Sequence, residues 1–177
     1  MNNHTRPTLI IGLGNPGSRY VNTYHNVGAK AVRALVTHSE DNTNTPHRLL
    51  LFTYWKRWEF TFVIPSVFMN DSGRAVRAAC THFRTKPKNL LVVHDDSDLP
   101  LGSFRMGFGR GSAGHHGVYS VIESLGTKNF WRFRIGIRKK EGKAERFVLK
   151  TMSRDDERNL YSAFEALRRK LTEKENP

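Results

Sequence analysis

The sequence has a single cysteine, Cys80, and no apolar stretch that approaches the roughly 20 residues of a membrane-spanning helix. One cysteine excludes an intrachain disulfide framework and is typical of a reducing compartment. Residues 1–8 are too few and too polar for a signal peptide. These absences disfavour a secreted, disulfide-rich protein and a membrane partner. They favour the cytoplasm, with the mitochondrial matrix as an alternative location.

Acidic residues are scarce relative to basic ones. Lys and Arg total 29 against 16 Asp and Glu, so the formal net charge is +13 and the pI is near 10.3. Such an excess favours a polyanionic partner, and nucleic acid comes before a membrane because no basic amphipathic surface helix stands out. The basic residues concentrate from Arg105 onward. We therefore expect contact with nucleic acid in that part of the chain.

The chain is long enough for one domain with a hydrophobic core. Strands are expected at residues 9–11, 49–54, 59–64, 90–93, 103–108 and 130–137. Helices are expected to begin at or near Val27, Ser72, Val118 and Ser153. A basic turn through Lys56 and Arg57 is expected to join the second and third strands. This alternation predicts an α/β fold, a single domain over 1–177 in which helices flank a twisted mixed sheet, with flexible ends at 1–7 and 172–177.

Residues 9–17 read as a buried strand followed by a glycine turn, and the turn spells the dinucleotide-binding pattern G-x-G-x-x-G. Two features argue against nucleotide binding. In a dinucleotide fold the helix begins inside the glycine motif, whereas here Pro16 and about ten polar or aromatic residues precede the helical spacing near Val27. The fold also needs an acid about 20 residues further on, and none occurs between Ser18 and Ser39.

Polar residues follow several of the expected strands. Ligands of α/β sheets bind beyond the carboxyl ends of strands, so these residues are candidates for chemistry. They occur in four clusters, Asn15, His25-Asn26, Met69-Asn70 and His94-Asp95, and the Gly-His-His-Gly segment 114–117 ahead of a helix is a fifth. A histidine beside a carboxylate is the usual composition of a general base with its orienting group. Spacing alone leaves open which histidine pairs with which aspartate, and each histidine also fits a structural or solvated role.

Two other kinds of site are disfavoured. A metal site needs three or four ligands at compatible spacing, but His115 and His116 are neighbours that point in different directions, and no H-x-x-x-H or C-x-x-C pattern occurs. A serine nucleophile is expected in a G-x-S-x-G elbow, which residues 111–114 do not form. The sequence therefore predicts no metal and no covalent intermediate.

Residues 107–114 form a glycine-rich segment that contains Arg110. Backbone N–H groups and arginine together suit phosphate, although the same composition also fits a mobile turn. In the strand expected at 130–137, Arg132 and Arg134 fall on one face by alternation.

Six motifs occur in order along the chain: Gly-Leu-Gly-Asn-Pro-Gly (12–17), Thr-Tyr-His-Asn-Val-Gly (23–28), Phe-Met-Asn-Asp-Ser-Gly (68–73), His-Asp-Asp-Ser-Asp-Leu-Pro-Leu-Gly (94–102), Gly-His-His-Gly (114–117) and Arg-Phe-Arg-Ile-Gly-Ile (132–137). Together they resemble the bacterial-type peptidyl-tRNA hydrolase family, and they span most of the chain. The resemblance implies a monomeric esterase without metal or cofactor. Such an enzyme hydrolyses the ester between a peptide and tRNA; ribosome association is left open.

The resemblance also implies roles for individual residues. His25 would be the general base that activates water, Asp95 would orient it, and Asn15 and Asn70 would position the peptide and the water. The Asn70 amide would also stabilise developing oxyanion charge. Further substrate contacts are implied for Tyr20, Met69, His115 on the cleft rim, and His116. Contacts with tRNA are implied for Arg105, Arg110 and Arg134.

The chain departs from the family pattern at three positions. His116 stands where the family usually has an Asn that contacts the substrate, and Tyr24 stands where an Arg usually precedes the catalytic His. Gly107 replaces one half of a basic pair that holds the tRNA 5′-phosphate, and Arg134 matches the other half. Arg105 or Arg110 would have to substitute for the missing group. We expect these changes to alter the substrate-binding rim and to leave the base and its orienter intact.

A non-catalytic RNA-binding relative is the alternative function. Such a protein would have little reason to retain the four residues assigned to catalysis, His25, Asp95, Asn15 and Asn70, and all four are present. The hydrolase is therefore the favoured hypothesis.

Overall fold

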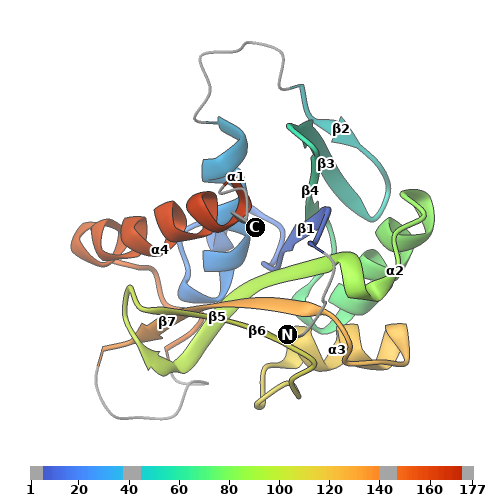
Figure 1. Cartoon of the computed structure of the whole chain (residues 1–177). Coiled ribbons are helices and arrows are strands. Elements are labelled where there is room, and N and C mark those ends of the chain that lie inside the picture. Colours follow the sequence, from blue (N-terminus) through green and yellow to red (C-terminus); the bar gives the residue numbers. More distant parts are fainter. Residues whose placement is uncertain (1–5, 38–44, 140–146, 173–177) are drawn as a thin grey trace, which may run out of the picture.

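The computed structural model describes residues 6–37, 45–139 and 147–172, and within them a seven-stranded sheet lies between two layers of helices (Figure 1). The strands are β1 (Leu9–Gly12), β2 (His47–Arg48), β3 (Phe52–Arg57), β4 (Phe60–Pro65), β5 (Leu90–Pro100), β6 (Phe104–Phe108) and β7 (Trp131–Arg138). The helices are α1 (Val27–Thr37), α2 (Ser72–His82), α3 (His116–Leu125) and α4 (Arg154–Thr172). Of the ends expected to be flexible, residues 1–5 and 173–177 lie outside the described residues.

The sheet is mixed, in the order β2-β3-β4-β1-β5-β7-β6. Strands β4, β1, β5 and β7 run parallel in its centre. The remaining strands pair antiparallel at the two edges. Every residue of β1 is buried, as expected for a central parallel strand covered on both faces.

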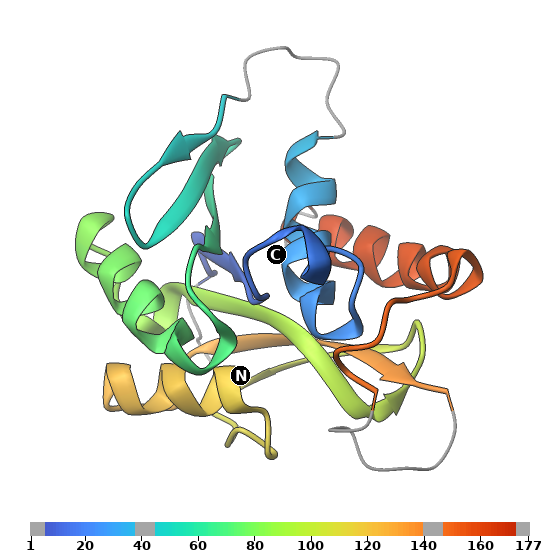
Figure 2. The same ribbon diagram turned by 180° about the vertical axis from the view of Figure 1, so that it is seen from behind.

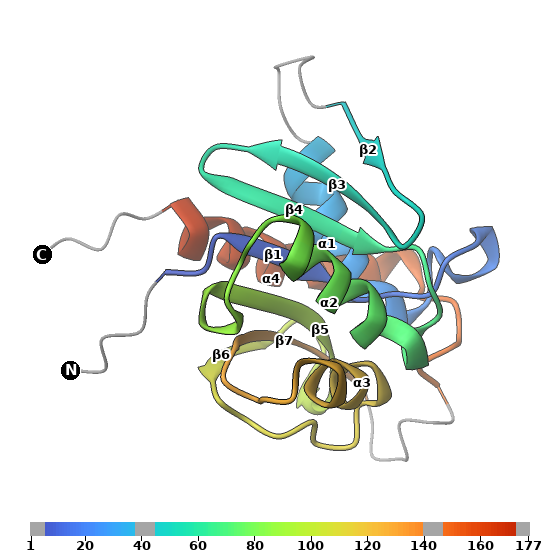
Figure 3. The same ribbon diagram turned by 90° about the vertical axis from the view of Figure 1, so that its right-hand side faces the viewer.

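Helices α1 and α4 cover one face of the sheet, and α2 and α3 cover the other (Figure 3). Alternate residues of β5 divide between the two cores because side chains alternate along a strand: Leu91 and Val93 pack with α1 and α4, whereas Leu90 and Val92 pack with α2 and α3. The expected α/β fold with helices flanking a mixed sheet is confirmed. None of the helices in the described ranges is both long and apolar enough to cross a membrane.

The expected turn at Lys56 and Arg57 is wrong. Both residues belong to β3, where they pair with Thr61 and Phe60 of β4. The chain turns at Trp58 and the next residue, and Trp58 has the positive φ of 53° that a tight turn requires. Charged residues are common in turns, but at the end of a hairpin near the edge of a sheet they also fit a strand, because their side chains reach solvent while the backbone pairs.

Strand β5 is longer than its aliphatic run. It continues beyond Val93 because His94, Asp95 and Asp96 pair with Arg134, Ile135 and Gly136 of β7. Their backbone polar groups are satisfied by this ladder, so the polar side chains do not end the strand. The candidate carboxylate Asp95 therefore stands on the rigid sheet instead of in a loop.

The glycines of the opening motif allow α1 to lie directly on the sheet. A Cβ on Gly28 would lie 2.2 Å from the Val93 carbonyl oxygen and 2.9 Å from that of Leu13, and one on Gly12 would lie 2.4 Å from the Gly28 oxygen. Helix α1 begins only at Val27, after short 3-10 helices at residues 18–20 and 24–26. This late start agrees with the expectation that the motif is not a dinucleotide site.

We expect Gly28→Ala to lower the free energy of unfolding by about 3 kcal/mol or more, because the atoms that a Cβ would meet are backbone and cannot rotate away. Urea denaturation followed by circular dichroism measures the change. Gly111→Ala is the matched control, since a Cβ there meets nothing within 4 Å. Equal unfolding midpoints for Gly28→Ala and the wild type would show that α1 is not held in this close contact.

Candidate active site

His25 lies in the loop between β1 and α1, and this loop is tied to the segment that leads into α4 (Figure 2). The His25 N–H donates to the Val148 carbonyl at 2.8 Å, and the Met152 N–H donates to the Asn22 carbonyl at 2.8 Å. Backbone contacts from a distant part of the sequence therefore fix the main chain at His25, which is the kind of rigid support that a catalytic group requires.

Asp95 accepts hydrogen bonds from two histidines. His25 Nδ1 lies 2.9 Å and 3.1 Å from the two carboxylate oxygens, and His115 Nε2 lies 2.9 Å from Oδ1. The two rings face each other with centroids 4.9 Å apart. Only 12% of the His25 side chain is exposed, and no described residue bonds to its Nε2. The structure thus pairs His25 with Asp95 and leaves one imidazole nitrogen open.

His115 is the N-cap of α3, and this fixes its tautomer. Its Nδ1 accepts a hydrogen bond from the Val118 N–H at 3.2 Å, so its proton is on Nε2, where it is donated to Asp95. The side chain is only 9% exposed. Capping turns the ring inward against Asp95, so little of the side chain is exposed at the position that the resemblance places on the cleft rim.

Burial and hydrogen bonding set the charges of the pair in opposite directions. Burial on its own would raise the pKa of the Asp95 carboxyl, but His115 and His25 hold that pKa well below its usual range. Burial on its own would lower the pKa of His25, but the hydrogen bond to Asp95 and the charge of Asp95 outweigh it and raise that pKa above 6.5. Asp95 is thus ionised at neutral pH and stabilises a proton on His25.

His94 is a buried neutral ring next to this pair. Its Nδ1 lies 2.7 Å from the Asp95 carbonyl oxygen, and its ring meets that of His115 edge-on with centroids 4.7 Å apart. Burial, with help from nearby His115 and Arg132, holds the pKa of His94 well below 6.5. The neutral His94 ring donates to the Asp95 carbonyl and so helps to hold the backbone of Asp95 in place.

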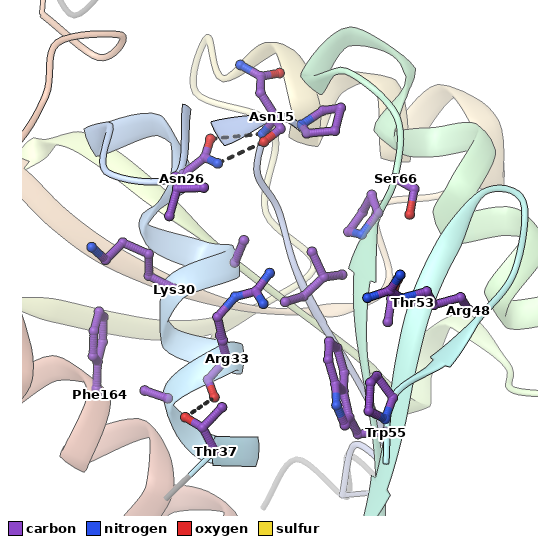
Figure 4. A pocket seen from close by; sticks show the side chains of 18 of the residues that line it. Asn15, Asn26, Lys30, Arg33, Thr37, Arg48, Thr53, Trp55, Ser66 and Phe164 are labelled. Carbon is purple, nitrogen blue, oxygen red and sulfur yellow. Dashed lines mark hydrogen bonds between the residues drawn. The ribbon is translucent and has the colours of Figure 1, made fainter. Parts of the chain in front are cut away.

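Asn15 is oriented by three hydrogen bonds. Its N–H donates to Asn26 Oδ1 and its carbonyl accepts from Asn26 Nδ2, both at 2.9 Å (Figure 4). Its side-chain oxygen accepts from the Met69 N–H at 2.8 Å. The amide nitrogen of the side chain bonds to no described residue, so it can donate to a ligand.

Met69 links the loop that carries Asn15 to the start of α3. It is buried and bonded to Asn15, and a Cβ on Gly117 would lie 2.3 Å from its sulfur, so the start of α3 packs directly on it. Asn70, the next residue, is exposed, as is His116 at the first position of α3, and neither side chain has a hydrogen-bond partner in the described parts of the chain. The Asn70 amide and the His116 imidazole are therefore accessible to a ligand.

Two aromatic residues stand close to this group. Tyr20 is partly buried, and its ring meets Phe68 edge-on at a centroid distance of 6.1 Å. Phe68 is 55% exposed, directly before Met69. Large apolar groups exposed beside a polar site are typical of ligand-binding surfaces.

Tyr24 does not alter the rim, contrary to expectation. Its side chain is buried, its hydroxyl donates to Asp156 Oδ2 at 2.7 Å, and its ring packs edge-on against Phe147. Burial and Asp156 raise the pKa of Tyr24 to about 12, so the hydroxyl keeps its proton. An aromatic ring with one polar tip suits this interior position. The departure from the family pattern at residue 24 therefore concerns the packing of α4.

A cavity of about 700 Å³ lies next to the site, between α1 and the β3–β4 hairpin (Figure 4). Asn15 and Asn26 line its upper end, and Lys30, Arg33 and Trp55 lie along it. His25 and Asp95 do not line it, so the cavity adjoins the histidine–aspartate cluster and does not contain it.

Four arginines gather on the other side of β5. Arg105, Arg110, Arg132 and Arg134 line a cavity of about 510 Å³ between β6, β7 and the loop that follows β6. The Arg134 guanidinium is held by a salt bridge from Nε to Asp96 Oδ2. The three arginines expected to contact tRNA therefore lie together, and Arg132 joins them.

Within the described ranges, one trio of side chains has the composition of a metal site. His25, Asp95 and His115 each offer one ligand atom, and these atoms lie within 4.8 Å of one another. Spacing missed this trio because the three residues are far apart in sequence. Both histidine nitrogens already donate protons to Asp95, so an ion would have to displace two hydrogen bonds. Hydrogen bonds within the trio therefore already occupy the atoms that would bind an ion.

A sequence model described as peptidyl-tRNA hydrolase matches residues 9–174. The chain belongs to this family. Among curated relatives, the peptidyl-tRNA hydrolase of Corynebacterium efficiens is 39% identical over 153 residues, covering 85% of this chain and 86% of the relative. That of Synechococcus sp. is 42% identical over 162 residues, covering 84% and 77%. The resemblance based on six motifs is confirmed.

Solved structures agree with this assignment. The crystal structure of peptidyl-tRNA hydrolase from Acinetobacter baumannii matches with a TM-score of 0.84 at 28% identity, covering 96% of this chain and 89% of that one. The family fold therefore accounts for nearly the whole chain.

Two residues of the site are not among the candidates that the sequence indicates. Asp96 holds Arg134, and Arg132 lines the arginine cavity. Asp96 adjoins the candidate Asp95, which was the available signal. For Arg132 the signal was weaker, because its position on the same face as Arg134 does not reveal that it is buried. The candidate Asn26 contributes by holding Asn15 in place.

Proposed function

We propose that this chain hydrolyses the ester that joins a peptide to the terminal ribose of tRNA, with His25 as the general base. The observation that carries the proposal is the hydrogen bond from His25 Nδ1–H to Asp95, which leaves Nε2 open in a site shared with Asn15 and Met69. Family membership supports the substrate class. The proposal needs no metal and no cofactor.

In the proposed reaction, His25 Nε2 accepts a proton from a water molecule as that water attacks the ester carbonyl carbon. Asp95 stabilises the imidazolium that forms. Amide donors of Asn70 and Asn15 bind the oxyanion and position the peptide. When the intermediate collapses, the ribose oxygen leaves and takes the proton from His25. The products are a peptide with a free carboxylate and a tRNA with a free hydroxyl.

Further residues contact parts of the substrate that do not react. Tyr20, Met69 and His116 contact the acyl part, whereas His115 acts through Asp95. The arginines Arg105, Arg110 and Arg134 bind the tRNA backbone, because guanidinium groups match phosphate. A monomeric state, ribosome association and a cytoplasmic or mitochondrial location all stay predictions.

The test is release of labelled acyl-amino acid from an N-acetylated aminoacyl-tRNA, with tRNA affinity measured in parallel. We expect release, and recovery of tRNA that can be charged again. Tight binding of tRNA without release would replace the hydrolase with the non-catalytic RNA-binding relative. Loss of both binding and release would reject both functions.

Replacing His116 by Asn is expected to leave kcat unchanged and to lower KM by about two- to tenfold, since a carboxamide offers a paired donor and acceptor to a peptide backbone that imidazole cannot offer. The side chain is exposed and unbonded, so the exchange does not disturb the fold. Steady-state kinetics on N-acetylated aminoacyl-tRNA measure the effect. A large loss of kcat would show that the cleft depends on the imidazole.

A further inference from the structure

One short turn carries both His25 and the buried Tyr24. Residues 24–26 form a 3-10 helix, in which three residues complete a turn, so successive side chains diverge by about 120°. His25 bonds to Asp95, whereas Tyr24 is buried in the core that α1 and α4 form with the sheet. Because both side chains belong to one turn, an anchor on Tyr24 fixes the rotation of that turn and, with it, the direction of the His25 ring.

The anchor of Tyr24 is a buried carboxylate that gathers several donors. The Tyr24 hydroxyl donates to Asp156 Oδ2 at 2.7 Å, and the Asp156 side chain is only 4% exposed. The Ser153 hydroxyl donates to the same oxygen at 2.7 Å, and Lys139 Nζ lies 2.9 Å from Oδ1. Asp156 therefore joins the turn that carries His25 to the end of β7 and to the first turn of α4.

The segment that leads into α4 supports the same turn from a second direction (Figure 2). Its Val148 carbonyl accepts from the His25 N–H at 2.8 Å. The Phe147 ring packs edge-on against the Tyr24 ring at a centroid distance of 5.8 Å. Since Asp156 holds the start of α4 directly after this segment, one carboxylate secures both the Tyr24 ring and the backbone that bonds to His25.

The bond between Tyr24 and Asp156 keeps its charge at every pH at which the enzyme would act. Burial on its own would raise the pKa of Asp156, but the hydrogen bonds that it accepts, that of Lys139 foremost, lower it to about 2. Burial and Asp156 raise the pKa of Tyr24 to about 12. A phenol that donates to an ionised carboxylate makes a stronger bond than one between neutral groups.

We propose that Tyr24 and Asp156 are positioning residues that hold the His25 ring in its direction toward Asp95. This inference rests on the proposed function, in which His25 is the base. A tyrosine suits the role because its side chain has only two rotatable bonds and loses little entropy when it is fixed. Without the hydroxyl the turn can rotate, and a small rotation moves the imidazole away from Asp95 and from the attacking water.

The test compares Tyr24→Phe with the wild type in single-turnover hydrolysis of N-acetylated aminoacyl-tRNA. The exchange removes the hydroxyl and keeps the ring that packs on Phe147. We expect the rate at saturating enzyme to fall by about tenfold, because a small displacement of a catalytic group is costly. The affinity for uncharged tRNA should not change, since the phenol is buried. Circular dichroism verifies that the variant is folded at the assay temperature.

The pH dependence distinguishes positioning from a role in the fold. The groups that face the His25 ring are Asp95 on β5 and His115 at the start of α3, and the neutral His94 lies against His115. Burial lowers the pKa of His25, and Asp95 outweighs burial and raises it. A ring turned away from Asp95 loses this support, so the rate of Tyr24→Phe should begin to rise at lower pH. A rate loss without this shift would overturn the proposal, as would a wild-type rate and profile.

Lys139→Gln is the matched control. Lys139 bonds to the same carboxylate, its side chain is 52% exposed, and its exchange leaves the bond between Tyr24 and Asp156 in place. The variant should keep the wild-type rate and pH profile. If Lys139→Gln changed both as much as Tyr24→Phe does, Asp156 would serve the fold of α4 alone, and the proposal would be overturned.

A measurement without substrate separates this inference from the proposed function. Titration of the His25 ring by proton NMR, with the signal assigned by its loss in His25→Ala, gives the pKa of His25 directly. We expect a lower pKa in Tyr24→Phe than in the wild type and in Lys139→Gln. Equal pKa values would overturn the inference and leave the hydrolase intact. A lowered pKa in a protein that cleaves no ester would reject the hydrolase and support the positioning of the ring.

Discussion

Replacing Asp95 by Asn is expected to slow ester hydrolysis by about 10³- to 10⁴-fold while the affinity for tRNA stays within about twofold. The carboxylate accepts protons from both His25 Nδ1 and His115 Nε2. A carboxamide can accept at one oxygen only, and its NH₂ group would face a histidine nitrogen. His25 would then accept at Nδ1 and carry its proton on Nε2, where it could no longer take one from water.

Single-turnover hydrolysis of N-acetylated aminoacyl-tRNA measures this loss. Asp98→Asn is the matched control, because Asp98 is an exposed carboxylate three residues further along the same strand, and it should keep the wild-type rate. Since Asp95 raises the pKa of His25, any residual activity of Asp95→Asn should begin at lower pH than that of the wild type. A loss smaller than about tenfold would mean that Asp95 does not orient the base.

His25→Ala is expected to reduce the single-turnover rate by about 10²- to 10⁴-fold with tRNA binding unchanged. Neither of the two histidines that lie beside His25 in the described structure, His115 and His94, can take over. Both nitrogens of His115 are engaged, one with the Val118 N–H and one with Asp95, and His94 is buried behind the carboxylate. Added imidazole should restore part of the rate, since the truncated side chain leaves room beside Asp95.

The control for this variant is His82→Ala, which removes an exposed histidine at the end of α2. It should cleave at the wild-type rate. Near wild-type cleavage by His25→Ala would assign the base to another group, and loss of tRNA binding in that variant would show that the ring serves binding as well.

The layers of the fold follow from local signals in the sequence. The aliphatic runs at 9–11 and 90–93 became the central strands, and helical spacing from Val27 and Ser72 became α1 and α2. The prediction of a turn at Lys56 and Arg57 is wrong because the preference of charged residues for turns is weak compared with the pairing that a neighbouring strand offers.

The site was less accessible to sequence reasoning because its contacts join distant segments. His25 and Asp95 are 70 residues apart, and the bond between them depends on β5 continuing past its aliphatic run. The inward turn of His115 depends on its role as a helix cap. Burial of Arg132 depends on how β6 and the following loop cover β7. The alternation of side chains along β7 indicates which face of the sheet carries Arg132, but it does not indicate which segments cover that face.

The most direct test of the account is the pH dependence of single-turnover hydrolysis, wild type beside His25→Ala, from about pH 5 to about pH 9 after subtraction of the uncatalysed rate. Because Asp95 raises the pKa of His25 above 6.5, the wild-type rate should rise through a single ionisation above that value and then level off. The variant should lack this rise. A wild-type profile without it, or the same rise in the variant, would contradict the assignment of His25 as the base.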